Sequence, residues 1–193
     1  MNILNELLML AEAKGKNLLG LTINNKKITE QTPHEPWPGN FYCYNKQLTS
    51  LEFCPKEVGD DFYGHNNKLT SLEFCPKEVG GDFGCSFNKL TSLEFCPKEV
   101  GGEFWCSFNK LTSLADIHKR LKKMNGIFYA NYNPIKSNVI GLMLVAGCKE
   151  VKLDNKEVMN IMNKHLPNTK GHLGLLECQE ELLSAGFEEW AEL

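Results

Sequence analysis

Apolar residues recur along the chain with a period of 21 residues. The stretch KLTSLEFCPKEVGGDF, residues 68–83, returns at residues 89–104 with one change, an aspartate to a glutamate at the penultimate position. Four leucines keep the same spacing: Leu48, Leu69, Leu90 and Leu111. A unit of this length cannot bury its own apolar face and gains stability only by stacking on the next unit. The repeat therefore predicts a solenoid.

Each unit contains a short alternating segment, seen most clearly in GGEFWCSFNKL, residues 101–111. We number its positions as places one to eleven, so that Phe104, Cys106, Asn109 and Leu111 occupy places four, six, nine and eleven. These places match the leucine-rich-repeat frame L-x-x-L-x-L-x-x-N-x-L. The alternation predicts a β-strand whose fourth and sixth places face the interior and whose third, fifth and seventh places face outward.

Other places complete the predicted interior. The ninth-place asparagines should form a buried ladder that satisfies backbone groups of the turns: Asn67, Asn88 and Asn109. Further apolar residues are expected to fill the interior around the bend: Leu51, Leu72, Leu93, Leu114, Phe53, Phe74 and Phe95. The Gly-Gly pair at places one and two is expected to form the bend into the strand.

Looser copies of the unit extend the repeat at both ends, at residues 18–28, 125–135 and 148–155. The expected fold class is therefore an α/β solenoid, a leucine-rich repeat with about seven parallel strands. An insertion at residues 114–126 reads as a helix that turns Ile117, Leu121 and Met124 inward. It leaves a basic group outside: His118, Lys119, Arg120, Lys122 and Lys123.

Helical patterns flank the repeats. Residues 2–14 predict an amphipathic N-terminal capping helix, and residues 156–165 and 173–184 predict a C-terminal helical cap. The expected organisation is an N-terminal capping helix, a leucine-rich-repeat solenoid and a C-terminal helical cap, at residues 1–17, 18–155 and 156–193.

Variation between copies is concentrated on the outward strand face. The fifth, seventh and eighth places change from copy to copy and are rich in aromatic residues, whereas the return segment barely changes. An exposed surface of this composition is typical of interface anchors. The alternative is that stacked aromatics only stabilise neighbouring strands. The leucine-rich-repeat frame predicts that this outward strand face is concave. The expected partner-binding residues on the concave face are Tyr42, Tyr44, Tyr63, His65, Phe87, Trp105, Phe108, Tyr129 and Tyr132, with an acidic third-place row, Asp61, Asp82 and Glu103.

Composition adds little to this picture. The net charge is −3 and 42% of the residues are hydrophobic, which favours neither disorder nor binding to polyanions. The N-terminal pattern carries Glu6 and Glu12, unlike a secretory signal, and the chain has no apolar run long enough to span a membrane. We therefore expect a cytoplasmic protein without a membrane partner.

Six of the eight cysteines recur at two repeat places, and no C-x-x-C pair occurs, which disfavours a zinc site or a thioredoxin-type site. Stacked strands would allow disulfides geometrically, but the expected compartment favours reduced, buried thiols. The five histidines, His34, His65, His118, His165 and His172, fall in unrelated elements. The sequence thus predicts no enzyme, no cofactor and no metal site.

The unit LTSLEFCPKEVGGDFGCSFNKL resembles the short leucine-rich repeats of tailed-bacteriophage proteins. The ending NKHLPNTKGHLGLLECQEELLSAGFEEWAEL is similar to the C-terminal cap that accompanies such repeats. Phe53, Phe74 and Phe95 depart from the pattern, because glycine is frequent there. The resemblance implies a phage-encoded protein in the cytoplasm of a bacterial host, which binds and inhibits a host protein such as a defence factor.

Two other classes of function stay open at this stage. In a small-ligand or nucleotide sponge, the aromatics would stack on bases and the tenth-place lysines, Lys68, Lys89 and Lys110, would meet phosphates. In a self-assembling or virion accessory protein, the same face would contact another copy or a particle. The basic group of the insertion could touch nucleic acid, although a solvated surface is the simpler interpretation.

Overall fold

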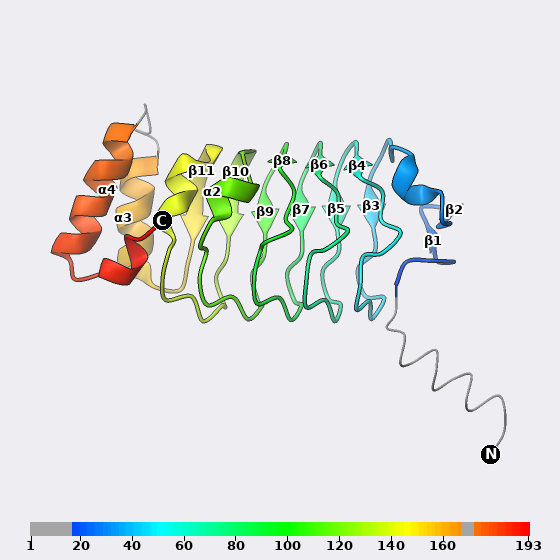
Figure 1. The fold of residues 1–193 in the computed structure, drawn as a ribbon, viewed down its shortest axis with the longest axis horizontal. Helices are drawn as coiled ribbons and strands as arrows, with labels where there is room; N and C mark the ends of the chain where they lie inside the picture. The colour runs from blue at the N-terminus through cyan, green and yellow to red at the C-terminus, as the bar shows by residue number, and fades with distance from the viewer. Residues whose placement is uncertain (1–16, 167–171) are drawn as a thin grey trace, which may run out of the picture.

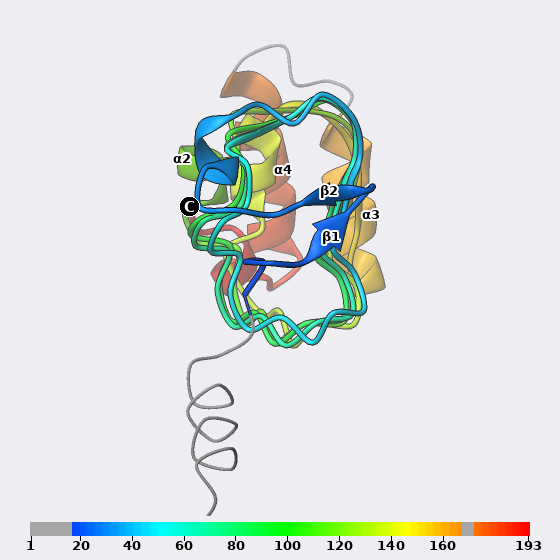
Figure 2. The ribbon, with the colours of Figure 1, turned by 90° about the vertical axis from the view of Figure 1, so that its right-hand side faces the viewer.

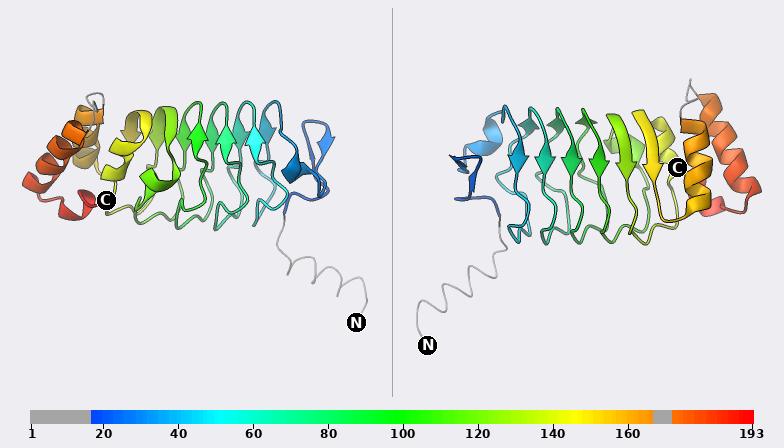
Figure 3. Two further views of the ribbon diagram at one scale, coloured as in Figure 1. Left: turned by 45° about the horizontal axis from the view of Figure 1, so that its top comes forward. Right: turned by 180° about the vertical axis from the view of Figure 1, so that it is seen from behind.

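The computed structural model describes residues 17–166 and 172–193. In it the chain winds into a solenoid of parallel strands, one turn for each regular repeat (Figure 1). Seen along the long axis, successive turns superpose and enclose the interior (Figure 2). The turns stack in a nearly straight row, so the strand face is flatter than the concave surface that the leucine-rich-repeat frame led us to expect (Figures 1 and 3).

Each turn carries two very short strands separated by a bend. The first set forms one parallel ladder: β4 (Glu57–Val58), β6 (Glu78–Val79) and β8 (Glu99–Val100). The second set contains places four and five and forms another: β3 (Phe41–Tyr42), β5 (Phe62–Tyr63), β7 (Phe83–Gly84) and β9 (Phe104–Trp105). Both ladders keep the repeat register, so identical places lie side by side.

The two ladders merge in one longer strand. In β10 (Lys123–Tyr129), Lys123 pairs with Glu99 of β8, and Phe128 pairs with Phe104 of β9. The last strand, β11 (Ala146–Lys152), pairs with β10 in parallel. This confirms the strand expected near residues 148–155, two residues earlier than its sequence pattern suggested.

The Gly-Gly pair is required by the close approach of successive turns. A Cβ atom on Gly101 would lie 1.9 Å from the carbonyl oxygen of Gly80, and one on Gly102 would lie 2.1 Å from Oδ1 of Asp82. No real Cβ contact is that short. The pair therefore does more than form the expected bend, because it lets the turns stack and leaves room for the third-place carboxylate.

The interior is a continuous apolar column, as the alternation predicts. Its centre is a row of fully buried fourth-place rings: Phe41, Phe62, Phe83, Phe104 and Phe128. Neighbouring ring centroids are 4.9 to 5.7 Å apart. The sixth-place cysteines and the repeat leucines are also buried. Their burial supplies the hydrophobic stabilisation that a single turn lacks.

One part of the predicted interior is wrong. Phe74 and Phe95 are 55% and 45% exposed, and Phe53 is only partly buried. Phe53 and Phe74 have positive φ angles of 72° and 67°. In this left-handed conformation the side chain leaves the backbone in another direction than in an extended strand, so strand alternation does not place it inside. Glycine would fit this place without strain.

The ninth-place asparagines form the expected buried ladder. Oδ1 of Asn88 accepts the backbone N–H of Leu69 in the preceding turn at 3.0 Å. Its Nδ2 donates to the carbonyl oxygens of Gly64 and Cys85, both at 3.0 Å. The same pattern recurs at Asn67, Asn109 and Asn133. Each amide therefore joins two turns through groups that would otherwise be buried without partners.

The first predicted repeat, at residues 18–28, is not a parallel turn. β1 (Thr22–Ile23) and β2 (Lys26–Lys27) form an antiparallel hairpin across the open end of the coil (Figure 2). Asn24 and Asn25 between them have φ angles of 49° and 63°, as a two-residue hairpin turn requires. The predicted count of seven parallel strands is therefore too high, because it includes a parallel strand at the N-terminal end. A 3-10 helix, η1 (Thr32–His34), leads into the first full turn.

The insertion contains less helix than predicted. α2 (Ile117–Arg120) is a single turn, and Met124, expected on the helix, is buried in β10 instead. Ile117 and Leu121 are buried as expected. Met124 is in a strand and not in the helix because β10 completes both ladders. A longer helix would leave β8 and β9 without a neighbour.

Two helices lie at the C-terminal end of the coil (Figure 1). They are α3 (Lys156–His165) and α4 (His172–Ser184), as the patterns predict, and between β10 and β11 and after α4 come the 3-10 helices η2 (Ile140–Leu144) and η4 (Glu188–Trp190). Asn163 of α3 bonds both the N–H and the carbonyl of Val151 in β11. The last strand is thus not left open.

The expected N-terminal capping helix at residues 2–14 lies outside the described residues, as does most of the segment 1–17. None of the helices that the structure describes has the length and apolar character needed to span a bilayer. The eight cysteines, all within the described ranges, are free and buried, as predicted for reduced thiols.

Candidate functional site

The strand face carries the predicted aromatic residues together. We call it the aromatic face and define it by places five, seven and eight of the turns that contain β3, β5, β7, β9 and β10. The right-hand view of Figure 3 looks onto these strands. Ring contacts or a shared groove connect all nine predicted residues: Tyr42, Tyr44, Tyr63, His65, Phe87, Trp105, Phe108, Tyr129 and Tyr132.

The fifth-place row is divided into two halves. Tyr42 stacks on Tyr63 with ring centroids 5.5 Å apart, and Trp105 lies 4.8 Å from Tyr129. Gly84 stands between the halves and has no ring. A Cβ on Gly84 would lie 2.6 Å from Cδ1 of Tyr63, so the Tyr63 ring leans over this glycine. The Tyr63 ring takes up part of the space of the missing side chain, and a groove remains between Tyr63 and Trp105.

The seventh-place row lies beside this gap and changes from rings to small polar residues. Tyr44 stacks on His65 at 5.1 Å. Burial lowers the pKa of His65 from its usual value, so its ring is neutral at pH 7. Ser107 donates to Oδ1 of Asn131 at 2.7 Å. The buried hydroxyl of Ser86, one turn earlier, has no hydrogen-bond partner among the described residues, a state that costs about 1–3 kcal/mol.

The eighth-place row holds aromatic rings on a left-handed backbone. The φ angles of Phe87, Phe108 and Tyr132 are 55°, 56° and 58°. Their rings stack at 4.2 and 4.1 Å, yet they are 52%, 40% and 59% exposed. The same place holds Asn45 and Asn66 in the first turns, also at positive φ. Asparagine tolerates this conformation, whereas a ring-bearing residue is strained in it.

The acidic third-place row has a structural role of its own. Oδ1 of Asp61 accepts the backbone N–H of Asp82 at 2.9 Å, and Oδ1 of Asp82 accepts that of Glu103 at 2.8 Å. These hydrogen bonds offset the repulsion between like charges at strand spacing, so the row needs no partner to be stable. Oδ2 of Asp82 also accepts the hydroxyl of Tyr63 at 3.0 Å. Burial, followed by this hydrogen bond, raises the pKa of Tyr63.

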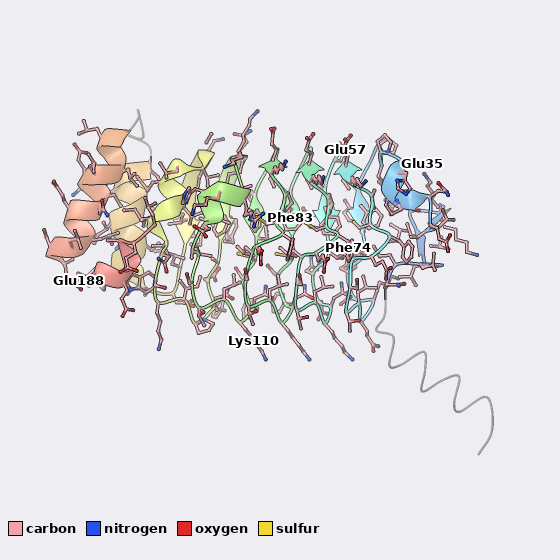
Figure 4. All side chains as sticks on the ribbon, viewed as in Figure 1. Glu35, Glu57, Phe74, Phe83, Lys110 and Glu188 are labelled. Carbon is pink, nitrogen blue, oxygen red and sulfur yellow. The ribbon has the colours of Figure 1, made fainter. Side chains whose placement is uncertain are left out.

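The tenth-place lysines lie on another edge. Lys110, labelled in Figure 4, extends from the lower edge of the solenoid, away from Glu57 at the upper edge. The expected basic group of the insertion is also elsewhere, and two of its members are paired. Lys119 bonds Asp116 at 2.6 Å and Arg120 bonds Glu94 at 3.5 Å. Neither set of cations lines the aromatic face.

A groove of about 400 Å³ lies where the three rows of the aromatic face meet. We call it the notch. Its lining includes Tyr63, Gly84, Ser86, Phe87, Trp105, Phe108 and Tyr129. The sequence predicted the rings around it but not the notch itself. The signal for it was present, since Gly84 is the one glycine in a row of tyrosines and a tryptophan.

The described residues offer little for catalysis or metal binding. They contain no group of three or more histidine, cysteine, aspartate or glutamate side chains that could hold a metal ion. Burial raises the pKa of the Cys43 thiol to about 12, and it raises the pKa values of the other cysteine thiols too. A buried neutral thiol is a poor nucleophile. The exposed rings of the aromatic face have the composition of interface anchors.

Comparisons of the chain with protein-family models, with curated proteins and with solved structures find no match. The candidate site therefore rests on the geometry of the aromatic face and its notch.

Proposed function

We propose that this chain is a non-enzymatic binding protein that recognises a protein partner through the aromatic face. The observation that carries the proposal is the eighth-place row, Phe87, Phe108 and Tyr132, whose rings are strained at the backbone and half exposed to water. A solenoid that needed only stability would keep the asparagines of its first turns at this place. Contact with a partner would account for exposed rings at these strained positions.

The magnitudes support this interpretation. A left-handed backbone costs an L-residue other than glycine roughly 1–2 kcal/mol, so three such aromatic residues cost about 3–6 kcal/mol. Their two stacked pairs return about 0.5–1.5 kcal/mol each. Stacking alone does not offset the strain. Burial of the exposed ring surface against a partner would, at roughly 25 cal/mol for each Å² of apolar surface.

A macromolecular partner fits the extent of the surface. The aromatic face runs from Tyr42 in β3 to Tyr129 in β10, across all the regular turns (Figure 3). Tyrosine, tryptophan and phenylalanine are common anchors of protein interfaces, because each buries a large area with few rotatable bonds. A small ligand would occupy only the notch and would leave the Tyr42 end of the face without a role.

The resemblance of the repeats to phage leucine-rich repeats supports a finer version of the proposal. In that version the chain is a leucine-rich-repeat protein encoded by a bacteriophage, and the helices α3 and α4 cap its solenoid. It works in the cytoplasm of the bacterial host. Its partner is a host protein, and binding inhibits that protein, which suits a defence factor.

The test compares two double variants in capture experiments from a bacterial host lysate. Tyr63→Ala with Trp105→Ala removes two rings of the aromatic face. Phe74→Ala with Phe95→Ala removes two exposed rings of the return segment and serves as the matched control. We expect wild type and control to enrich the same host protein, the Tyr63/Trp105 variant to lose it, and all three to keep the same circular dichroism spectrum. Equal enrichment by all three would contradict the proposal.

A further inference from the structure

We propose that the notch over Gly84 receives an arginine side chain of the protein partner. This inference rests on the proposed function and adds to it the chemistry of the group that the aromatic face recognises. Three features of the notch lead to it: flat aromatic walls, carboxylates at its rim, and an unsatisfied hydroxyl at its floor.

The walls of the notch suit a flat group. Trp105 and Tyr129 stand on one side and Tyr63 on the other, with Phe87 and Phe108 along the third. The gap exists because Gly84 interrupts a row that is otherwise aromatic. A guanidinium group is planar and stacks on aromatic faces, and it is attracted to the negative face of the ring. An aliphatic side chain would fill the gap without using either property.

The charges around the notch favour a cation. Asp82 lies at the rim, since its carboxylate accepts the hydroxyl of Tyr63 at 3.0 Å. Glu103 lies near the opposite wall, where its charge contributes to the raised pKa of Tyr129, second to burial. No lysine or arginine lines the notch, and all of its lining residues belong to the described part of the chain. Lys152 lies in register with Tyr129 in the next strand and is paired with Glu150, so a cation entering from the partner would meet more carboxylates than cations.

The floor offers a hydrogen-bond acceptor. Ser86 is 7% exposed, and its hydroxyl has no partner within the described ranges, although Ser107 in the next turn is bonded to Asn131. The Ser86 side chain lines the notch but its oxygen is buried, so we infer that the side chain rotates when its oxygen accepts a hydrogen bond from a donor inside the notch. Guanidinium carries five N–H donors and no acceptor. It can stack on the walls and donate to the floor at once.

The competing occupants fit less well. A nucleotide base could stack on the same rings, but its phosphates would approach Asp82 and Glu103 with no cation in the notch to bind them. A phenylalanine from the partner would match the walls, yet it would leave the Ser86 hydroxyl buried and unpaired. An arginine side chain matches the aromatic walls, the carboxylates at the rim and the Ser86 hydroxyl.

The experiment follows the indole N–H of Trp105 by nuclear magnetic resonance, assigned with a Trp105→Phe variant. The probes are acetyl-Gly-Arg-Gly-amide, the same peptide with citrulline, which is planar but uncharged, the same peptide with lysine, and adenosine monophosphate. We expect the arginine peptide to shift the Trp105 signal saturably. The citrulline peptide should bind about fivefold more weakly, because it lacks the cation–π attraction, and the other two probes more weakly than arginine.

Two variants locate the effect. Glu103→Gln removes a rim charge and should weaken the arginine peptide severalfold, whereas Glu78→Gln in β6, on the other strand ladder, should not. Equal binding of arginine and citrulline peptides, tighter binding of the nucleotide, or no shift of Trp105 by the arginine peptide would each overturn the inference. If the Tyr63/Trp105 variant still loses its captured protein in those cases, the binding function stands and only the arginine assignment falls.

Discussion

Replacing Asn109 by alanine should destabilise the solenoid through one specific backbone group. Oδ1 of Asn109 accepts the N–H of Leu90 at 3.0 Å, and its Nδ2 donates to the carbonyl oxygens of Cys85 and Cys106 at 3.1 and 3.0 Å. The two carbonyls keep a second donor in the variant, Asn88 for Cys85 and Asn133 for Cys106. The buried N–H of Leu90 loses its acceptor.

The expected cost follows from this inventory. An orphaned buried N–H costs about 1–3 kcal/mol, and the two weakened carbonyls add roughly 1 kcal/mol together. We therefore expect Asn109→Ala to lower the free energy of unfolding by about 2–4 kcal/mol. With a urea m value of about 2 kcal/mol/M, the midpoint of unfolding should fall by about 1–2 M.

The assay is urea unfolding followed by circular dichroism, with Lys110→Ala as the control. Lys110 is the exposed neighbour of Asn109, and surface substitutions of this kind usually change stability by less than about 0.5 kcal/mol. A variant that keeps the native spectrum and loses less than about 0.5 kcal/mol would refute the reasoning, because the amide would then not be holding the turns together.

Two further predictions concern pH. Burial raises the pKa of the Cys43 and Cys96 thiols from 9.0 to about 12, so the stability they contribute is complete below pH 9 and is lost as the pH rises toward 12. The unfolding free energy should therefore fall between pH 9 and pH 12, and it should fall less steeply in Cys43→Ala. The same pH dependence in Cys43→Ala and wild type would contradict a raised pKa of the Cys43 thiol. Hydrogen bonds from Lys164 and then His165 lower the pKa of Glu181 below 4.5, so its contribution is present above that pH and lost below it. Glu181→Gln should flatten the loss of stability in acid relative to the exposed control Glu180→Gln, and parallel acid curves would disprove this contribution.

The regular turns could be predicted from the sequence because each place repeats its environment. The stacked phenylalanines, the buried cysteines and the asparagine ladder follow from strand alternation and from the need to satisfy buried backbone groups. The predictions fail where the backbone leaves the extended region. Asn24 and Asn25 form a hairpin turn instead of strand places, and at positive φ Phe74 is exposed and Phe53 is only partly buried.

The candidate site was predicted in part for the same reason. Alternation placed Tyr63 and Trp105 on one face correctly, since both sit in regular strands. The left-handed backbone of the eighth place could not be derived from phenylalanine, which avoids it, although the asparagines at that place in earlier turns hinted at it. Whether the Ser86 hydroxyl finds a hydrogen-bond partner depends on the side chains of the adjacent turns. The spacing of the repeats does not predict such a contact.

The most direct test of the account is a comparison of stability and binding for one variant, Phe87→Asn with Phe108→Asn. This change restores the residue that the first turns use at the eighth place. It removes strain of about 2–4 kcal/mol and two stacked pairs worth about 1–3 kcal/mol in total, so the unfolding free energy should change by between a loss of about 1 and a gain of about 3 kcal/mol. We predict that capture of the host protein is lost while this stability is kept. A variant that unfolds much more easily and still captures the protein would show that the rings serve the fold and not a partner.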